Sequence, residues 1–100
     1  LNEKSVMGRG LRLLEALSRA GRPLPLADLA RVTQLPKSTV HRLVNQFVQL
    51  GLLDRSAEGF SLGLRMFEWG SHAERQRHLR MAAIPFLSEL HTRIGETVHL

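Results

Sequence analysis

The 100-residue sequence contains no cysteine, which excludes a disulfide framework and a thiolate metal site. No apolar run approaches the roughly 18 residues that a membrane-spanning helix needs, and no signal peptide opens the chain. Acidic residues are absent between Arg31 and Leu53, so this long segment carries no negative charge. From these absences we expect a cytoplasmic protein that has no membrane partner.

Positive charge is what the sequence has in excess. Lys and Arg number 14 against 9 Asp and Glu, which gives a net charge of +5, and most of the cations are arginine. Hydrophobic residues make up 43% of the chain, which is enough for a modest core and too much for a disordered segment. A small basic domain is typical of proteins with a polyanionic partner, either a nucleic acid or an anionic membrane. Because the chain begins with Leu1 and not with Met, we expect a fragment or a processed chain.

The first two thirds of the chain predict three helices and a hairpin. Ser5 is a plausible N-cap for a helix that runs to about Ala20 and is ended by Gly21. That helix carries an apolar ridge of Met7, Leu11, Leu14 and Leu17, widened by Leu13. The later elements are an extended Pro23-Leu24-Pro25, a helix over 26–33, a third helix over 36–50, and strands over 52–55 and 60–63 around a turn at 56–59.

The last third predicts shorter elements. A short helix is expected from Leu64 to about Trp69, with Gly70 ending it and Ser71 capping the next helix. Pro85 should break or kink that helix, and residues 96–100 have strand character. We therefore divide the chain into a domain over 1–70, a linker helix over 71–84, and the start of a second, truncated domain over 85–100.

The third predicted helix has two unlike faces. Val40, Leu43, Val44 and Phe47 form one apolar stripe at helical period. The opposite face is rich in hydrogen-bond donors and contains no carboxylate; it is formed by Ser38, Arg42, Asn45 and Gln49, flanked by Lys37, His41, Thr39 and Gln46. Such a face suits phosphates and base edges. The alternative is an ordinary amphipathic helix with a solvated polar side.

The order of helix, helix, short turn, helix and hairpin predicts a mostly α fold with a small β-hairpin, a winged helix-turn-helix. Leu29 and Ala30 of the second helix should brace Val40 and Leu43 of the third, so that the third can enter a major groove. The hairpin would then lie near the DNA backbone, where Arg55 could touch a phosphate.

Residues 5–70 strongly resemble the DNA-binding domain of the IclR family of bacterial transcription regulators. The resemblance is carried by residues 9–17 (RGLRLLEAL), 26–30 (LADLA), 35–43 (LPKSTVHRL), 50–53 (LGLL) and 60–65 (FSLGLR). Residues 85–100 look like the entry to the family's effector-binding domain. One departure is Gln34, where the family usually has glycine; a positive φ there would cost on the order of 1 kcal/mol.

The resemblance implies a repressor or activator that binds a pseudo-palindromic operator in double-stranded DNA as a homodimer or tetramer. It also implies a small-molecule effector, bound by a C-terminal domain that is nearly all missing here. By matched position, the residues expected to face DNA are Lys37, Ser38, Thr39, Arg42, Asn45 and Gln46.

The sequence leaves the roles of several residues open. Arg42 could read a guanine or grip a phosphate, and His41 could touch a phosphate, stay solvated or read a base. Arg9 and Arg12 could contact the DNA backbone or lie on a solvated face. Met66, Phe67 and Trp69 could pack between the winged domain and the linker helix, or form an exposed apolar seam for a dimer partner.

No constellation in the sequence supports an enzyme. Ser-His-Asp logic, a P-loop and a dinucleotide fingerprint are absent, and His72 and His78 are not at metal-ligand spacing. We expect no cofactor and no metal. The alternative function is a winged helix used as a protein-interaction or RNA-binding module, which would favour exposed apolar residues on the outer face of the third helix.

Overall fold

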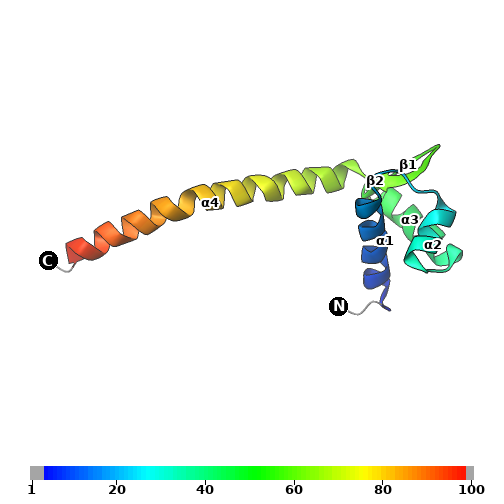
Figure 1. The fold of residues 1–100 in the computed structure, drawn as a ribbon, viewed down its shortest axis with the longest axis horizontal. Helices are drawn as coiled ribbons and strands as arrows, with labels where there is room; N and C mark the ends of the chain where they lie inside the picture. The colour runs from blue at the N-terminus through cyan, green and yellow to red at the C-terminus, as the bar shows by residue number, and fades with distance from the viewer. Residues whose placement is uncertain (1–3, 99–100) are drawn as a thin grey trace. The chain divides into compact units, whose positions relative to one another are not determined.

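The structure is a computed structural model that describes residues 4–98. The chain divides into two compact units, Leu1–Phe67 and Glu68–Leu100. The first unit contains helices α1, α2 and α3 and the strands β1 and β2, as labelled in Figure 1. The mostly α fold with one small hairpin, predicted from the sequence, is confirmed.

Helix α1 spans Val6–Ala20 and begins and ends as its sequence predicts. The hydroxyl oxygen of Ser5 accepts a hydrogen bond of 2.9 Å from the backbone N–H of Gly8, which satisfies one of the free donors of the first turn. Gly21 ends the helix in the left-handed conformation, with φ of 65°. Gly10 lies inside the helix because the ring of Phe47 packs against it; a Cβ there would lie 2.9 Å from the Phe47 Cζ.

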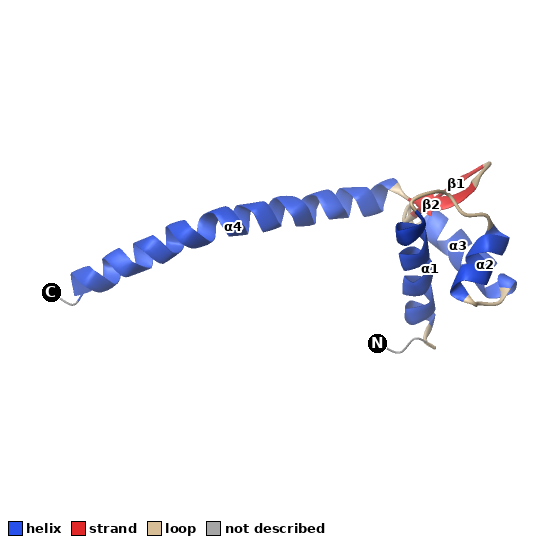
Figure 2. Cartoon of the chain, viewed as in Figure 1, coloured by secondary structure: helices blue, strands red, loops and turns tan. Residues whose placement is uncertain are grey.

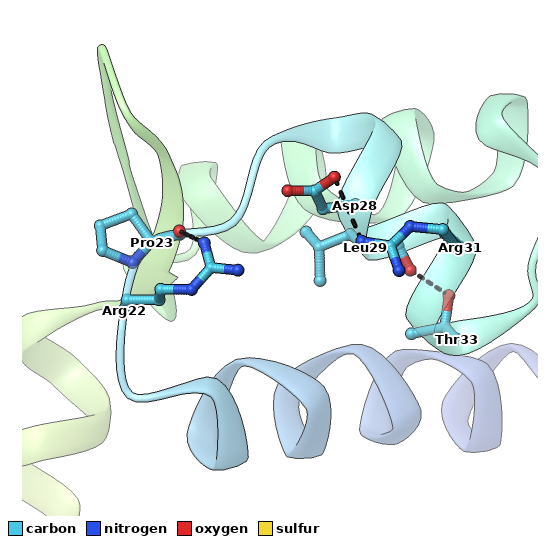
Figure 3. A network of polar contacts seen from close by, with 6 residues as sticks. All are labelled: Arg22, Pro23, Asp28, Leu29, Arg31 and Thr33. Atoms are coloured by element: carbon cyan, nitrogen blue, oxygen red, sulfur yellow. Dashed lines mark hydrogen bonds and ion pairs between the residues drawn. The ribbon is translucent and has the colours of Figure 1, made fainter.

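Helices α2 (Leu26–Thr33) and α3 (Lys37–Gln49) form the helix-turn-helix. Between them Gln34 has φ of 59°, so the residue that replaces the expected glycine does adopt the left-handed conformation. Near the end of α2 the hydroxyl of Thr33 donates a 2.6 Å hydrogen bond to the carbonyl oxygen of Leu29, as Figure 3 shows. This bond satisfies the buried hydroxyl within its own helix.

Strands β1 (Leu53–Ser56) and β2 (Gly59–Leu62) form the predicted antiparallel hairpin, drawn in red in Figure 2. The connector between α1 and α2 pairs with it: the N–H of Leu24 donates to the carbonyl of Phe60 at 2.9 Å, and the N–H of Phe60 donates back at 2.8 Å. The sequence predicted an extended connector but not this pairing. The bridge anchors the wing to the body of the unit.

The core of the first unit is drawn from its three helices, from β1 and from the connectors before α2 and α3. Its members are buried hydrophobic side chains: Leu13, Leu17, Leu24, Leu29, Ala30, Leu35, Val40, Leu43, Val44 and Leu53. The contacts predicted between α2 and α3 lie at its centre, since Leu29 and Val40 are fully buried. Because this core packs against one side of α3, the opposite side is exposed and can contact a ligand.

The apolar ridge predicted on α1 is split between the core and the surface. Leu13 and Leu17 are buried, whereas Met7 is 85% exposed and Leu11 is 40% exposed. The residues of this ridge therefore do not all pack inward. Leu13 lies at the centre of the buried face, and Met7 and Leu11 point more than 90° away from it at about 100° per residue.

Helix α4 spans Leu64–Val98 and corrects two predictions. Gly70 does not end a helix, and residues 96–98 are helical, not a strand. Of the break or kink predicted at Pro85, the break is not found, because Pro85 lies inside the helix. His99 and Leu100, the rest of that predicted strand, lie outside the described residues. Gly70 carries no left-handed φ, so it lacks the conformation of a C-terminal cap. Pro85 removes one N–H from the helix, and the remaining hydrogen bonds continue it.

Two alternatives were predicted for Phe67 and Trp69, namely packing between the winged domain and the linker helix or an exposed apolar seam. Phe67 is 72% exposed and Trp69 is 55% exposed. Both therefore keep large apolar surfaces in contact with solvent in this chain.

Candidate nucleic-acid interface

The outer face of α3 is exposed along its length. Of the residues expected to face DNA, Lys37, Ser38, Arg42 and Gln46 are exposed and Thr39 is half-buried. Because Val40, Leu43 and Val44 bury the opposite side of the helix, this polar face can only point outward. The face keeps two cations and no carboxylate, so it presents donors to an incoming polyanion.

The N-terminus of α3 has no side-chain cap. Pro36 occupies the N-cap position and makes no side-chain hydrogen bond to the first turn. The N–H groups of that turn, which no carbonyl of the helix can satisfy, lie beside Lys37 and Ser38. This end of the helix therefore combines backbone donors with a lysine and a hydroxyl.

The wing contributes Arg55, which points toward α3. Along β1 the buried side chain of Leu53 faces the body of the unit, so Arg55, two residues later, lies on the same side of the strand. Its guanidinium carbon lies 5.4 Å from the centre of the Phe60 ring, in cation–π contact. Asp54 lies on the opposite side of the strand, so the wing turns its cation and not its carboxylate toward α3.

Three of the predicted residues are joined by hydrogen bonds. Arg55 Nη2 donates to the Oδ1 of Asn45, although ten residues separate them in the chain. The Nδ2 of Asn45 lies 3.3 Å from the Nε2 of His41, one turn earlier on α3. Helix α3 and the wing are thus connected through side chains.

Gln46 lies at the margin of this face. It lines an open apolar groove of about 470 Å³ between α1 and α3, whose other lining residues are Val6, Met7, Gly10, Leu11, Leu14, Leu43, Phe47 and Leu50. Gln46 therefore borders two surfaces, the polar face of α3 and this groove. The predicted DNA contacts stay predictions for the whole set, Lys37, Ser38, Thr39, His41, Arg42, Asn45, Gln46 and Arg55.

Arg12 has a role that sequence reasoning did not foresee. Its Nη2 donates a 2.6 Å hydrogen bond to the carbonyl oxygen of Thr33, the last residue of α2. It is therefore not a fully solvated residue, since one of its N–H donors is used within the protein. A cation suits this position, because the C-terminal end of a helix has unpaired carbonyls and a partial negative charge.

The connection between Asn45 and Arg55 was also missed. Strand alternation carried a usable signal, because Leu53 in the core places Arg55 on the side that faces α3. The sequence offered no signal for the choice of Asn45 as its partner.

This geometry defines the class of protein as a winged helix-turn-helix, with an uncovered polar α3 and a wing that turns one arginine toward it. Residues 6–57 match the family model of the IclR helix-turn-helix domain. The chain therefore belongs to the IclR family of transcription regulators.

Similar proteins agree with this assignment. The chain is 37% identical to the HTH-type transcriptional regulator KipR of Bacillus subtilis, over 77% of this chain and 31% of that protein. It is 34% identical to the transcriptional repressor IclR of Escherichia coli, over 92% of this chain and 34% of that protein. A crystal structure of an IclR homologue from Microbacterium sp. is similar with a TM-score of 0.67 and 31% identity, covering 90% of this chain and 38% of that one. The chain spans about a third of the length of its curated relatives.

Proposed function

We propose that the chain binds double-stranded DNA sequence-specifically, with α3 (predicted over 36–50) in the major groove, as the DNA-binding part of a repressor or activator. The observation that carries this proposal is the exposed outer face of α3, which is rich in donors and free of carboxylates. A docking surface for a protein partner would expose apolar side chains there. Ser38, Arg42 and Gln49 are polar and exposed, which argues against that alternative.

The roles of individual residues follow from their places on α3 and the wing. Arg42 projects from the middle of the outer face, where a guanidinium can contact the O6 and N7 of a guanine. Lys37, Ser38 and Thr39 surround the uncapped N-terminus, which favours a phosphate. Arg55 would bind a second phosphate from the wing. His41 and Gln46 lie at opposite margins of the face and would contact the sugar-phosphate backbone of the DNA.

We further propose that the chain forms a homodimer through the groove between α1 and α3, with a second copy as its occupant. Met7, Leu11 and Leu14 form an exposed or half-buried ridge with the 4–3 spacing of pairing helices. Leu50, which is 54% exposed, extends this apolar surface onto α3. An apolar patch of this kind on a small domain is typical of a protein interface.

When two copies of α1 pair antiparallel about a two-fold axis, the ridge of each copy faces the same ridge of the other, which is the symmetry of an isologous interface. Two α3 helices related by a two-fold axis would fit a pseudo-palindromic operator.

The parts of the chain beyond the first unit have proposed roles as well. We infer that residues 71–84 act as a linker helix and that residues 85–100 begin a domain that binds a small-molecule effector, in a cytoplasmic protein. In support, one similar structure, an IclR homologue from Microbacterium hydrocarbonoxydans at 34% identity, was crystallised with 4-hydroxybenzoate. Within residues 4–98, no helix combines the length and apolarity needed to cross a membrane.

Fluorescence anisotropy of labelled duplexes across a salt series tests the DNA-binding proposal. We expect tighter binding to one fragment from beside the gene than to its scrambled sequence, and a log–log salt slope of roughly 0.9 per phosphate contact. Arg42→Ala should remove the sequence preference. Arg75→Ala, an exposed arginine of α4, is the matched control and should keep it. Equal and weak binding of every duplex would contradict the proposal.

A further inference from the structure

Both arms of the Asn45 side-chain amide are engaged in the free chain. Its Oδ1 accepts a hydrogen bond from Nη2 of Arg55 on β1. Its Nδ2 lies 3.3 Å from Nε2 and 3.5 Å from Nδ1 of His41. Asn45 is half-buried, whereas Ser38, Arg42 and Gln49 on the same face are exposed.

This arrangement ties the Asn45 amide to two protein neighbours. An asparagine reads adenine with both arms, because Oδ1 accepts from N6 and Nδ2 donates to N7. In this chain one acceptor position of Oδ1 is taken by Arg55, and Nδ2 lies against the ring of His41, so both arms already have a protein partner. The orientation of the amide is therefore set by Arg55 and His41.

Arg55, in contrast, is held in place without losing its capacity to bind. The Phe60 ring supports its guanidinium at 5.4 Å, and Phe60 is its direct cross-strand neighbour on β2. A guanidinium has five N–H donors, so a hydrogen bond to Asn45 leaves others available. The ion pairs found among the described residues do not involve Arg55, so its charge is not neutralised by a carboxylate there.

We propose that Asn45 is a positioning residue that holds Arg55 of the wing against α3, and that it does not read a base. A long arginine side chain that is already ordered loses less conformational freedom on binding a phosphate. The hydrogen bond also fixes the guanidinium of Arg55 relative to the outer face of α3. The phosphate contact of the wing and the base contacts of α3 are therefore held at a fixed spacing along the DNA. This inference rests on the proposed DNA binding.

A double-mutant cycle tests it on the full chain. The dissociation constants of wild type, Asn45→Ala, Arg55→Ala and the double variant are measured on the preferred duplex and on its scrambled form. We expect each single variant to weaken binding about five- to tenfold on both duplexes, so that the preference is kept. The double variant should be within about twofold of Arg55→Ala, because the second substitution removes an interaction already lost.

The salt dependence adds a readout that a purely structural role would not change. Arg55→Ala should lower the log–log slope by about 0.9, the loss of one phosphate contact, and Asn45→Ala should lower it in the same direction. Gln49→Ala is the control on α3, because Gln49 is exposed. The fold-changes in dissociation constant caused by Gln49→Ala and Arg55→Ala should multiply when the two substitutions are combined. Circular dichroism of each variant should match the wild type, since these side chains lie outside the core.

Three results would overturn the proposal. If Asn45→Ala abolishes the preference at one base pair, leaves the salt slope unchanged and multiplies with Arg55→Ala, then Asn45 reads a base. If the wild type itself binds no duplex, the DNA-binding proposal fails and this one fails with it. Wild-type binding with an additive cycle would overturn only the positioning role.

Discussion

Arg12 and Thr33 are 21 residues apart in the chain, and the guanidinium Nη2 of Arg12 donates a 2.6 Å hydrogen bond to the carbonyl oxygen of Thr33. This bond connects α1 to the last residue of α2, directly before the turn that leads into α3. It therefore stabilises the helix-turn-helix at the end of α2, next to Gln34 and its left-handed backbone conformation.

Replacement of Arg12 by alanine should destabilise the first unit. A hydrogen bond from a charged donor to a half-buried carbonyl contributes on the order of 1–2 kcal/mol, and its loss leaves the end of α2 uncapped. Urea denaturation followed by circular dichroism would measure the decrease in the free energy of unfolding. Arg19→Ala, an exposed arginine on the same helix, should change it by less than about 0.5 kcal/mol. Equal effects of the two substitutions would show that the bond contributes nothing.

Gln34 should be a position where glycine stabilises the protein. Its φ of 59° places a side chain in the left-handed region, which costs an ordinary L-residue on the order of 1 kcal/mol. Gln34→Gly should raise the free energy of unfolding by less than that amount, because glycine is more flexible in the unfolded chain.

Two further variants at this position test the cause. Gln34→Ala should leave stability unchanged, since alanine meets the same backbone cost, and Gln34→Val should lower it because a β-branched side chain tolerates this region least. Thermal and urea unfolding would rank the three. A Gln34→Gly protein less stable than wild type would contradict the strain argument.

Helical periodicity and caps predicted α1, α2, α3 and the hairpin well, because those signals are local. The same local signals failed at Gly70 and Pro85. A glycine ends a helix where it adopts a left-handed φ. A proline ends one where the backbone hydrogen bonds around it cannot continue the helix. Burial on α1 also depends on packing, so the sequence could not show that Leu13 enters the core while Met7 remains exposed. The link between Asn45 and Arg55 joins two elements, which no periodicity reveals.

Two glycines should respond in opposite ways to alanine. A Cβ at Gly59 would lie 2.4 Å from the backbone carbon of Leu24, and its φ of 131° is unsuited to other residues. Gly59→Ala should therefore cost more than about 2 kcal/mol and separate the wing from the connector. A Cβ at Gly70 would meet no atom of the described residues within 4 Å, and Gly70 has no positive φ. Gly70→Ala should therefore stabilise α4 by about 0.5–1 kcal/mol.

Amide hydrogen exchange would distinguish these two effects. In Gly59→Ala, protection should fall at Leu24 and Phe60, whose N–H groups form the bridge. In Gly70→Ala, protection should rise along α4 and stay constant in the hairpin. Unchanged protection of Phe60 in Gly59→Ala would mean that the connector can move aside without cost.

The last prediction concerns the exposed ridge of α1. A carboxylate at Leu11 would lie near the two-fold axis of the proposed dimer, opposite its own copy, so Leu11→Glu should place like charges together and desolvate them. The chain should then be monomeric by sedimentation equilibrium at concentrations where the wild type is dimeric. Met7→Glu provides a second test that cannot disturb the core, because Met7 is 85% exposed.

Val32→Glu, an exposed apolar position on α2 that lies outside the groove, is the control and should leave the wild-type mass unchanged. The monomeric variants should also bind a palindromic duplex no more tightly than two separate half-sites, since the gain from a dimer comes from joining two binding events in one molecule. A dimeric Leu11→Glu protein would show that the two copies meet elsewhere. A monomeric wild type would show that this ridge alone does not bury enough apolar surface, because a stable interface needs on the order of 1,000 Å².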